Sequence, residues 1–468
     1  MSYVRFRKHY LHAPYLILGA CEFLLFALIP QITSWVAPLL GVTANPGLLQ
    51  PGVAILFALV LSTGTLAMGV YMAMVQEGMT AMFFRSLVAY FFLAGLALTL
   101  IHEVFPESGL NSNVLLLSIC LAFCGVLILR SAFLRLVDSA QLMRQVVVYG
   151  SGSVAAGLID DYLNHSAHLG IKIIGCIKDT EDPVVATELL MTPPADWAAF
   201  VRQHRISEVI MAPQERRRSE ANSLPLTELM KCKLSGTEIT DVQSFYERDM
   251  KKANISLVQP SWILYSDGFR ASKSRNASKR LLDLVISLVL AVLLLPFIVL
   301  TALAVLLETG RPVLYSQIRV GKNGRPFRIY KFRSMRQDAE KGGKAIWASE
   351  NDDRVTRVGA FIRNTRLDEL PQLYNVIRGD MSFVGPRPER PEFVVELTEK
   401  IPFYDTRHYV KPGLMGWAQL NYPYGASVED ARGKLEYDLY YSKNHSLMMD
   451  ILIMIQTVEV VLLGKGVR

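Results

Sequence analysis

The chain has 468 residues, of which 51% are hydrophobic, and its 49 lysines and arginines outnumber its 42 acidic residues to give a net charge of +7. This length allows two or three domains, and the apolar content with a positive mean hydropathy excludes a wholly soluble protein. In a membrane protein a net positive charge is typical of loops that face an anionic cytoplasmic leaflet. No nucleic-acid partner is therefore expected.

Four apolar stretches open the chain, at about residues 14–32, 53–75, 87–101 and 114–134. Most have the roughly 20 residues that a helix needs to cross a bilayer. Basic residues precede the first stretch, lie between the second and third, and follow the fourth, whereas residues 34–51 and 102–113 contain no lysine or arginine. The positive-inside rule therefore predicts a four-helix transmembrane bundle over residues 1–143, with both ends in the cytoplasm.

The next segment, residues 144–271, has the pattern of a Rossmann-like α/β domain. A buried strand at residues 145–149 leads into the turn Gly150-Ser-Gly152 and then into a helical pattern, and Asp179 follows a second predicted strand. Such glycines can bring backbone amides to a pyrophosphate at a helix start. The alternative is a domain of this fold that has lost its ligand and serves as a spacer or dimer module, and the sequence leaves this choice open.

A basic linker then leads into an apolar run at residues 281–307, which Pro296 interrupts near its middle. The run is long enough to span a bilayer at about 1.5 Å per residue. However, lysines and arginines flank both of its ends, which favours both ends on the cytoplasmic side. Because proline cannot donate an amide and clashes with the carbonyl four residues earlier, we predict a re-entrant helical hairpin. A kinked fifth span is the alternative.

The remainder of the chain predicts a soluble domain that stays close to the membrane. Two strands, residues 314–320 and 327–332, flank Gly321-Lys-Asn323-Gly324, which is a hairpin signal. Residues 447–463 are apolar but interrupted by three polar side chains, a pattern that predicts an interfacial amphipathic helix rather than a span.

Residues 363–389 contain the side chains best suited to catalysis. Asp368 and Glu369 lie just ahead of Pro371, which is best accommodated in a first helical turn, and arginines flank the pair. A carboxylate can attack phosphorus only where cations or a metal neutralise the phosphate. By local pattern alone, Asp368 could be a helix N-cap and the arginines a solvated helix face. The clustering of arginines around the pair favours phosphate chemistry.

A series of motifs follows in order from the linker onward: Lys279-Arg280-x-x-Asp283, Arg319-Val-Gly321, Lys331-Phe-Arg-Ser-Met335, Leu367-Asp-Glu-Leu-Pro-Gln372, Gly379-Asp-Met-Ser382, Gly385-Pro-Arg-Pro388, Lys411-Pro-Gly413 and Gly416-Trp-Ala-Gln419. Together they closely resemble the bacterial sugar transferase family, the monotopic polyprenyl-phosphate phosphoglycosyl transferases. The resemblance covers about residues 273–468. The segments before it resemble the extended members that initiate exopolysaccharide or O-antigen assembly. Leu295, where family members often have serine, departs from the pattern.

The resemblance implies a membrane protein of α plus α/β class with three parts. These are a four-helix transmembrane bundle over residues 1–143, a Rossmann-like domain over 144–271, and a monotopic phosphoglycosyl transferase domain over 272–468 with its re-entrant hairpin at 281–307. It also implies a multi-pass protein of the bacterial inner membrane with the catalytic domain on the cytoplasmic face. Whether the chain forms a homodimer is left open.

The resemblance further implies a two-step transfer. Asp368 would attack the sugar-linked phosphate of a UDP-sugar and expel UMP, and undecaprenyl phosphate would then displace the aspartate. Asp368 and Glu369 would contact Mg²⁺, and Glu369 would help to position the metal or the acceptor phosphate. Binding of phosphates, substrate or lipid headgroups would fall to five basic residues: Arg363, Arg366, Arg387, Lys331 and Arg333.

Two other functions fit the sequence less well. A nicotinamide-dependent nucleotide-sugar enzyme would need a Tyr-x-x-x-Lys pair in the domain of the glycine turn, and residues 144–271 contain none. A non-enzymatic membrane scaffold would leave the acidic pair and its arginines without a role. The sequence does not reveal which sugar is transferred.

Overall fold

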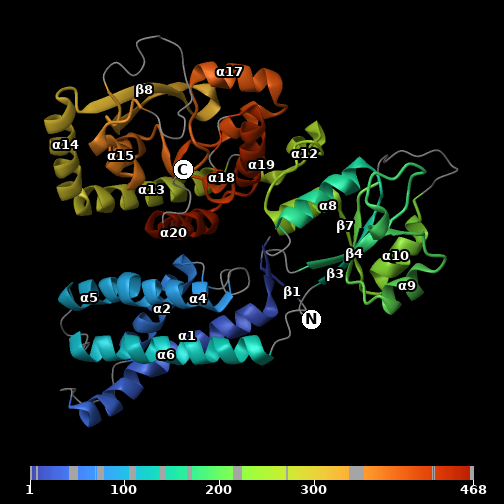
Figure 1. The fold of residues 1–468 in the computed structure, drawn as a ribbon, viewed down its shortest axis with the longest axis horizontal. Coiled ribbons are helices and arrows are strands. Elements are labelled where there is room, and N and C mark those ends of the chain that lie inside the picture. Colours follow the sequence, from blue (N-terminus) through green and yellow to red (C-terminus); the bar gives the residue numbers. More distant parts are fainter. Residues whose placement is uncertain are drawn as a thin grey trace. The chain divides into compact units, whose positions relative to one another are not determined.

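The computed structural model describes residues 3–6, 9–41, 51–68, 70, 78–104, 112–136, 144–165, 171–213, 224–269, 272–336, 353–423, 425 and 427–463. It divides into two compact units, Met1–Met250 and Lys251–Arg468 (Figure 1).

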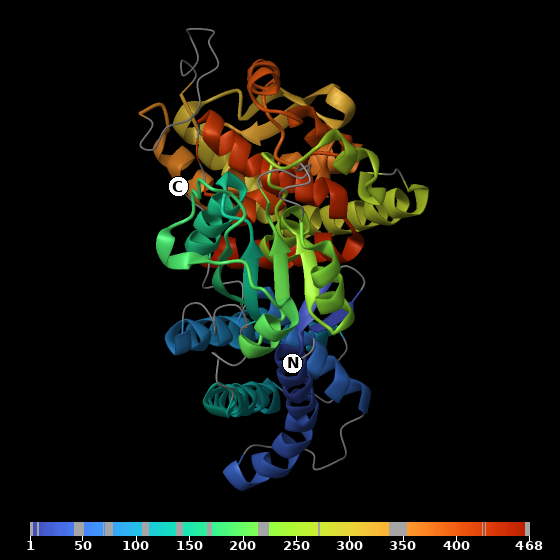
Figure 2. The ribbon, with the colours of Figure 1, turned by 90° about the vertical axis from the view of Figure 1, so that its right-hand side faces the viewer.

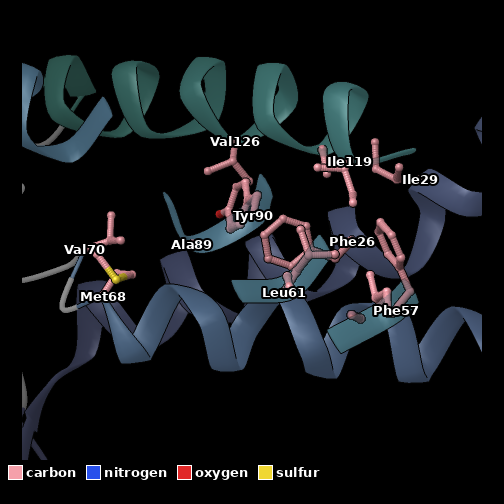
Figure 3. Packing of buried hydrophobic residues seen from close by; sticks show 14 of the residues in the cluster. Phe26, Ile29, Phe57, Leu61, Met68, Val70, Ala89, Tyr90, Ile119 and Val126 are labelled. Atoms are coloured by element: carbon pink, nitrogen blue, oxygen red, sulfur yellow. The ribbon is translucent and has the colours of Figure 1, made fainter. Parts of the chain in front are cut away.

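The first unit begins with a short hairpin and a set of apolar helices. Strands β1 (Tyr3–Phe6) and β2 (His9–His12) pair antiparallel. The helices are α1 (Ala13–Val36), η1 (Ala37–Leu40), α2 (Pro51–Ala67), the continuous run α4, η2 and α5 (Gly78–Leu87, Val88–Ala94, Gly95–Val104), and α6 (Ser112–Leu136). Figure 3 shows their shared core, in which Phe26, Leu61, Tyr90 and Val126 converge from different helices.

Three of these helices are long and apolar enough to cross a membrane: Leu16–Leu39, Met82–Glu103 and Val114–Arg135. The protein is therefore a membrane protein, as predicted. The second of the four predicted spans, residues 53–75, is not confirmed, because α2 ends at Ala67 and counts only as a shorter apolar helix. The end of the predicted span, residues 71–75, lies outside the described residues.

One charged pair is buried among the apolar helices. The guanidinium of Arg130 donates to both carboxylate oxygens of Glu22, at 2.6 and 2.8 Å, and also to Ser86 at 2.6 Å. Both charged side chains are almost fully buried. Ions in an apolar setting are costly unless they are paired and hydrogen-bonded, so this cluster joins α1, α6 and α4.

The remainder of the first unit is a five-stranded parallel sheet in the order β5-β4-β3-β6-β7, whose strands lie side by side in Figure 2. The strands are β3 (Arg144–Tyr149), β4 (Ile171–Ile177), β5 (Leu190–Met191), β6 (Glu208–Met211) and β7 (Glu238–Asp241). The helices are α8 (Ser153–His165), η5 (Thr187–Leu189), α9 (Trp197–Gln203), α10 (Leu226–Leu234), α11 (Val242–Phe245) and η7 (Tyr246–Met250). With β3, the first strand of this segment, at its centre, the sheet has the strand order of a Rossmann-like fold.

The glycine turn at residues 150–152 makes close contacts with other residues of the same domain. Gly150 has a φ of 140°, and a Cβ there would lie 2.1 Å from the carbonyl oxygen of Ala212, so only glycine fits. Asp179 accepts hydrogen bonds from the Ser151 amide at 2.8 Å and from its hydroxyl at 3.1 Å. The Asp179 carboxylate therefore occupies an amide that a bound pyrophosphate could otherwise use.

Two helices of the second unit meet at Leu294. Helix α13 (Lys273–Leu293) and α14 (Leu295–Thr309) are bent by 63° relative to each other (Figure 1). The predicted break at Pro296 is confirmed, and Leu295 in place of serine does not prevent it. Proline falls at the start of α14, where its missing amide has no partner to lose.

Both ends of the apolar run at residues 281–307 are tied to the same domain. Near the start of this run, Asp283 in the middle of α13 accepts from the Ser382 hydroxyl at 3.0 Å and the Phe383 amide at 2.9 Å. At the far end, Glu308 of α14 accepts from the amide of Val358 at 3.1 Å. Between these two contacts the side chains of many apolar residues are exposed, among them Leu288, Val292, Leu300 and Leu307.

The remaining elements build the body of this unit. The strands are β8 (Leu314–Val320) and β9 (Pro326–Phe332), an antiparallel hairpin as predicted, and the parallel pair β10 (Ser382–Val384) and β11 (Gly413–Met415). The helices are α12 (Pro260–Leu264), η8 (Asp267–Phe269), η9 (Lys322–Gly324), α15 (Arg357–Asn364), η10 (Leu367–Glu369), α16 (Gln372–Arg378), α17 (Pro391–Lys400), η11 (Tyr404–Tyr409), α18 (Trp417–Asn421), α19 (Val428–Asn444) and α20 (Leu447–Leu463).

Two segments pack differently from what their sequence pattern predicts. Ala253, Ile255 and Val258 belong to the core of the second unit rather than to the parallel sheet. Helix α20 has the predicted bounds, but Asp450 is buried and pairs with Lys279 at 2.7 Å. Asp450 therefore faces the interior of the domain, whereas in a purely interfacial helix it would face water.

Candidate active site

Asp368 and Glu369 lie in a short turn between two helices. Helix α15 begins at the N-cap Thr356, whose hydroxyl accepts from the Gly359 amide at 2.9 Å. After α15, Arg366 adopts a left-handed backbone with a φ of 60°, which reverses the chain into η10. The N-cap position of α16 is Pro371, without any side-chain cap. The N-cap interpretation of Asp368 therefore does not apply to α16.

Glu369 is held by two cations. Its Oε1 atom accepts from Nζ of Lys331 at 2.8 Å and from Nη2 of Arg387 at 3.2 Å. Burial opposes ionisation of Glu369, but Lys331 and Arg387 outweigh burial and hold the pKa of the carboxyl well below its usual range. Glu369 is therefore a permanent carboxylate at neutral pH.

Asp368 has a different environment, although it is adjacent in sequence. Its side chain is buried, with 8% of its surface exposed. Burial raises the pKa of Asp368, Lys331 opposes this effect, and the charge of Glu369 adds to it. Two neighbouring carboxylates with pKa values displaced in opposite directions are typical of a catalytic pair with two roles.

The turn is braced by residues that were not singled out from the sequence. Asn375 of α16 is fully buried; its Oδ1 accepts from the Tyr330 amide at 3.2 Å and its Nδ2 donates to the Arg328 carbonyl at 2.8 Å. These bonds hold α16 against β9, the strand that carries Lys331. An asparagine inside an apolar helical pattern was the available signal, because a buried amide needs partners.

A second brace positions Arg387. Arg407 donates to the Arg387 carbonyl at 2.9 Å and forms an ion pair with Asp438 at 2.7 Å. A Cβ on Gly385 would lie 2.2 Å from the Lys411 carbonyl, so the Gly-Pro-Arg-Pro turn packs directly on neighbouring backbone. The sequence contained no local signal for the Arg407–Asp438 pair, because its members are 31 residues apart.

The predicted basic residues separate into groups. Lys331 and Arg387 contact Glu369, while the charge of Arg366 opposes the rise in the pKa of Asp368 and adds to the fall in the pKa of Glu369. Arg363 lies in the last turn of α15, close in sequence to the pair, with its side chain partly buried. Arg333, by contrast, is buried at the end of α14, where it donates to the Thr309 hydroxyl at 3.0 Å and to the Gly310 carbonyl.

The pair also fits the donor chemistry of Mg²⁺. That ion is commonly bound by one or two carboxylates together with water and substrate phosphates. Asp368 and Glu369 supply two such carboxylates on adjacent residues. Among the described residues there is no group of three or more histidine, cysteine or acidic side chains able to hold a metal alone. A Mg²⁺ ion bound by these two carboxylates would complete its coordination with water or with phosphate oxygens of a substrate.

The fold and site define a membrane protein whose C-terminal domain buries a carboxylate pair among cations. Residues 274–464 match the family model described as bacterial sugar transferase. A UDP-glucose:undecaprenyl-phosphate glucose-1-phosphate transferase of Escherichia coli (strain K12) is 33% identical over 67% of each chain, and one of Klebsiella pneumoniae is 32% identical over 67% of each. The chain thus belongs to the bacterial sugar transferase family.

A third relative is more similar over a shorter stretch. A UDP-N-acetylgalactosamine-undecaprenyl-phosphate N-acetylgalactosaminephosphotransferase of Aeromonas hydrophila is 49% identical over 190 residues. These cover 41% of this chain and 45% of the relative, so the match spans less than half the length of that protein.

Proposed function

We propose that this protein transfers a sugar 1-phosphate from a UDP-sugar to undecaprenyl phosphate and releases UMP, as the first membrane step of exopolysaccharide or O-antigen biosynthesis. One observation carries the proposal. The buried Asp368 lies beside Glu369, which Lys331 and Arg387 hold ionised, within the segment that matches the family. The transferase activities named for the relatives support the same reaction class.

The proposed reaction has two displacements at one phosphorus atom. A carboxylate oxygen of Asp368 forms a bond to the sugar-linked phosphorus, while the bond from that phosphorus to the UMP oxygen breaks and UMP leaves with the electron pair. An oxygen of undecaprenyl phosphate then attacks the same phosphorus, and Asp368 leaves as a carboxylate. Lys331, Arg366 and Arg387 offset the negative charge that otherwise repels a carboxylate from phosphate.

Glu369 has a supporting role in this proposal. As a permanent anion it fixes Lys331 and Arg387 beside Asp368. Mg²⁺, held by Asp368, Glu369 and the substrate phosphates, would neutralise phosphate charge during the displacement. Arg363 is proposed to bind a donor or acceptor phosphate.

Mass spectrometry of the intact protein tests the covalent step. Wild-type protein incubated with UDP-glucose or UDP-N-acetylgalactosamine, without lipid acceptor, should gain the mass of a sugar phosphate on Asp368 and release UMP. Asp368→Asn should show neither, whereas Asp405→Asn, the same change at a largely exposed aspartate, should behave as wild type. Transfer to lipid without any adduct would contradict the two-step reaction.

We further propose that the bend between α13 and α14 forms a re-entrant hairpin in the cytoplasmic leaflet of the bacterial inner membrane. Asp283 and Glu308 tie both of its ends to one compact domain, and a span would require those ends to lie on opposite faces of the bilayer. The exposed apolar side chains between them would contact lipid. We propose that the four-span arrangement of the N-terminal helices keeps both ends of the bundle in the cytoplasm.

Cysteine labelling distinguishes the hairpin from a span. In a cysteine-free background, Lys231→Cys and Lys400→Cys place reporters before and after the bent pair, at lysines that are 62% and 52% exposed. An impermeant maleimide should label both positions in inverted membrane vesicles and neither in intact spheroplasts. Labelling of the two positions from opposite sides would establish a fifth span. The mass of the detergent-solubilised protein would decide between a monomer and a homodimer, which the sequence leaves open.

A further inference from the structure

A cavity of about 340 Å³ lies in the second unit, apart from the carboxylate pair. Its size falls in the range of small-ligand sites, roughly 300–1,000 Å³. Five basic side chains line it: Arg275, Lys279, Arg280, Lys322 and Lys411. One carboxylate, Asp283, is also among its lining residues. We define this space as the basic cavity.

The basic cavity and the active site lie at opposite ends of α16. Arg280 donates to the carbonyls of Val376 and Ile377 in the last turn of α16, both at 2.6 Å. Asp368 and Glu369 precede the first turn of the same helix. Its 7 residues rise by about 10 Å in total, so one phosphate cannot occupy both places.

The positive charge of the basic cavity is only partly neutralised. Lys279 pairs with Asp450, while Arg280 is bonded to carbonyl oxygens, which carry no net charge. Asp283 directs one carboxylate oxygen to Ser382 and Phe383. Within the described part of the chain, the side-chain ammonium groups of Lys322 and Lys411, both of which line the cavity, form no ion pair and no hydrogen bond.

Two neighbouring groups reflect this surplus charge. Burial and the nearby Arg280 lower the pKa of Lys411. Burial and the nearby Arg275 lower the pKa of His445, which lines the same cavity, to about 4. His445 is therefore neutral at pH 7 and adds no further cation.

A buried hydroxyl in the wall also lacks a partner. Ser442 is 1% exposed, and its Oγ makes no hydrogen bond in the described structure. Leaving a buried polar atom unsatisfied costs about 1–3 kcal/mol, so such atoms commonly mark a place where a ligand or water binds. A hydroxyl donor together with lysines and arginines is the donor set that a phosphate group requires.

We propose that the basic cavity binds the phosphate of an anionic membrane lipid headgroup. Arg280 directly precedes Leu281, the first of the exposed apolar side chains of α13. The cavity therefore lies at headgroup depth, a step that rests on the proposed membrane placement of the α13–α14 hairpin. Lys322 and Lys411 bind the phosphate oxygens, and the Ser442 hydroxyl donates a hydrogen bond to one of them. The bound lipid holds the domain at the membrane surface without taking part in the transfer.

Binding measurements on the full-length protein in detergent test this proposal without any turnover. The variant Lys322→Gln/Lys411→Gln removes the two lysines that lack partners. The control variant Lys231→Gln/Lys400→Gln makes the same change of charge at two exposed lysines. Thermal unfolding without ligand establishes that both variants fold. The probes are phosphatidylglycerol, followed by native mass spectrometry, and UMP or inorganic phosphate, followed by calorimetry.

Phosphatidylglycerol should bind the wild type and the control variant equally, and the cavity variant at least about tenfold more weakly. UMP and inorganic phosphate should bind all three proteins alike. If the cavity variant instead loses affinity for UMP or inorganic phosphate alone, the site takes a soluble phosphate and the lipid assignment is overturned. If it binds every probe as the wild type does, the cavity is not a phosphate site. Because no UDP-sugar is present, these outcomes are independent of whether the transferase reaction occurs.

Discussion

Nζ of Lys331 and Oε1 of Glu369 lie 2.8 Å apart, although 38 residues separate them in the sequence. The ion pair links β9 to the turn before α16 and places a cation beside the buried Asp368. Lys331 opposes the rise in the pKa of Asp368 that burial causes. This geometry joins the three side chains into one electrostatic unit.

Replacing Lys331 with methionine should therefore change the pH dependence of the reaction. Without the cation, the already raised pKa of Asp368 rises further, so the ionised nucleophile is lost at a higher pH on acidification. The acid limb of kcat/KM should shift to higher pH, and the rate at pH 7 should fall about 100-fold as a charge-stabilising donor is lost. Steady-state UMP release across pH measures both effects.

The control for this prediction is Lys400→Met, at an exposed lysine paired with Glu396 on the same helix. It should leave the pH profile unchanged. An acid limb that stays in place in Lys331→Met would show that Asp368 does not control it.

Asp283 should tolerate asparagine but not alanine. The same oxygen, Oδ1, accepts from both Ser382 and Phe383, and an asparagine side chain retains one such oxygen. Asp283→Ala leaves a buried hydroxyl and a buried amide without an acceptor, at a cost of about 1–3 kcal/mol for each group. Thermal unfolding in detergent should therefore rank wild type and Asp283→Asn close together, with Asp283→Ala well below. Equal losses in the two variants would show that the charge itself is needed.

Gly359 in α15 leaves no space for a side chain. A Cβ there would lie 2.0 Å from the carbonyl oxygen of Ser334, so Gly359→Ala must displace α15, the helix that precedes Asp368. We expect a loss of about 1–3 kcal/mol in stability and a marked loss of UMP release.

The matched control is Gly157→Ala in α8, where a Cβ would meet nothing within 4 Å. In a helix interior this change should stabilise the protein by roughly 0.5–1 kcal/mol. Unfolding midpoints of the two variants that move in the same direction would refute the steric argument.

The buried pair Glu22–Arg130 should be essential for the stability of the apolar helices. Glu22→Gln leaves the guanidinium without its counter-charge, and breaking a buried pair costs about 3–5 kcal/mol. The control is Arg135→Leu, at an exposed arginine near the end of α6, the helix that carries Arg130. Unfolding in detergent should separate the two variants clearly. The double variant Glu22→Leu/Arg130→Leu should regain most of the loss, and failure to do so would assign a further role to the charges.

The family and the catalytic candidates were predictable because their signals are local. The break at Pro296, the hairpin around Gly324 and the placement of Asp368 before a helix each depend on a few neighbouring residues. The assignment of Arg333 to phosphate, substrate or headgroup binding came from the same kind of reasoning. The structure places Arg333 at the end of α14, where its buried guanidinium donates to the carbonyl oxygens of Thr309 and Gly310.

Contacts between distant segments could not be predicted in this way. Asp450 interrupted an apolar run and therefore favoured an interfacial helix, yet its carboxylate is buried against Lys279, 171 residues earlier. Arg407 had no local signal for its contact with Asp438, and the only signal for Asn375 was an amide side chain within an apolar helical pattern.

The sequence alone determined the membrane character, the order of the elements and the acidic pair. These features depend on hydrophobic runs and turn residues, which act over short distances along the chain. Which cations meet Glu369, and how far each carboxyl of the pair is buried, depended on packing between segments that lie far apart. Burial and charge act through space, so the opposite pKa displacements of Asp368 and Glu369 followed only from the folded chain.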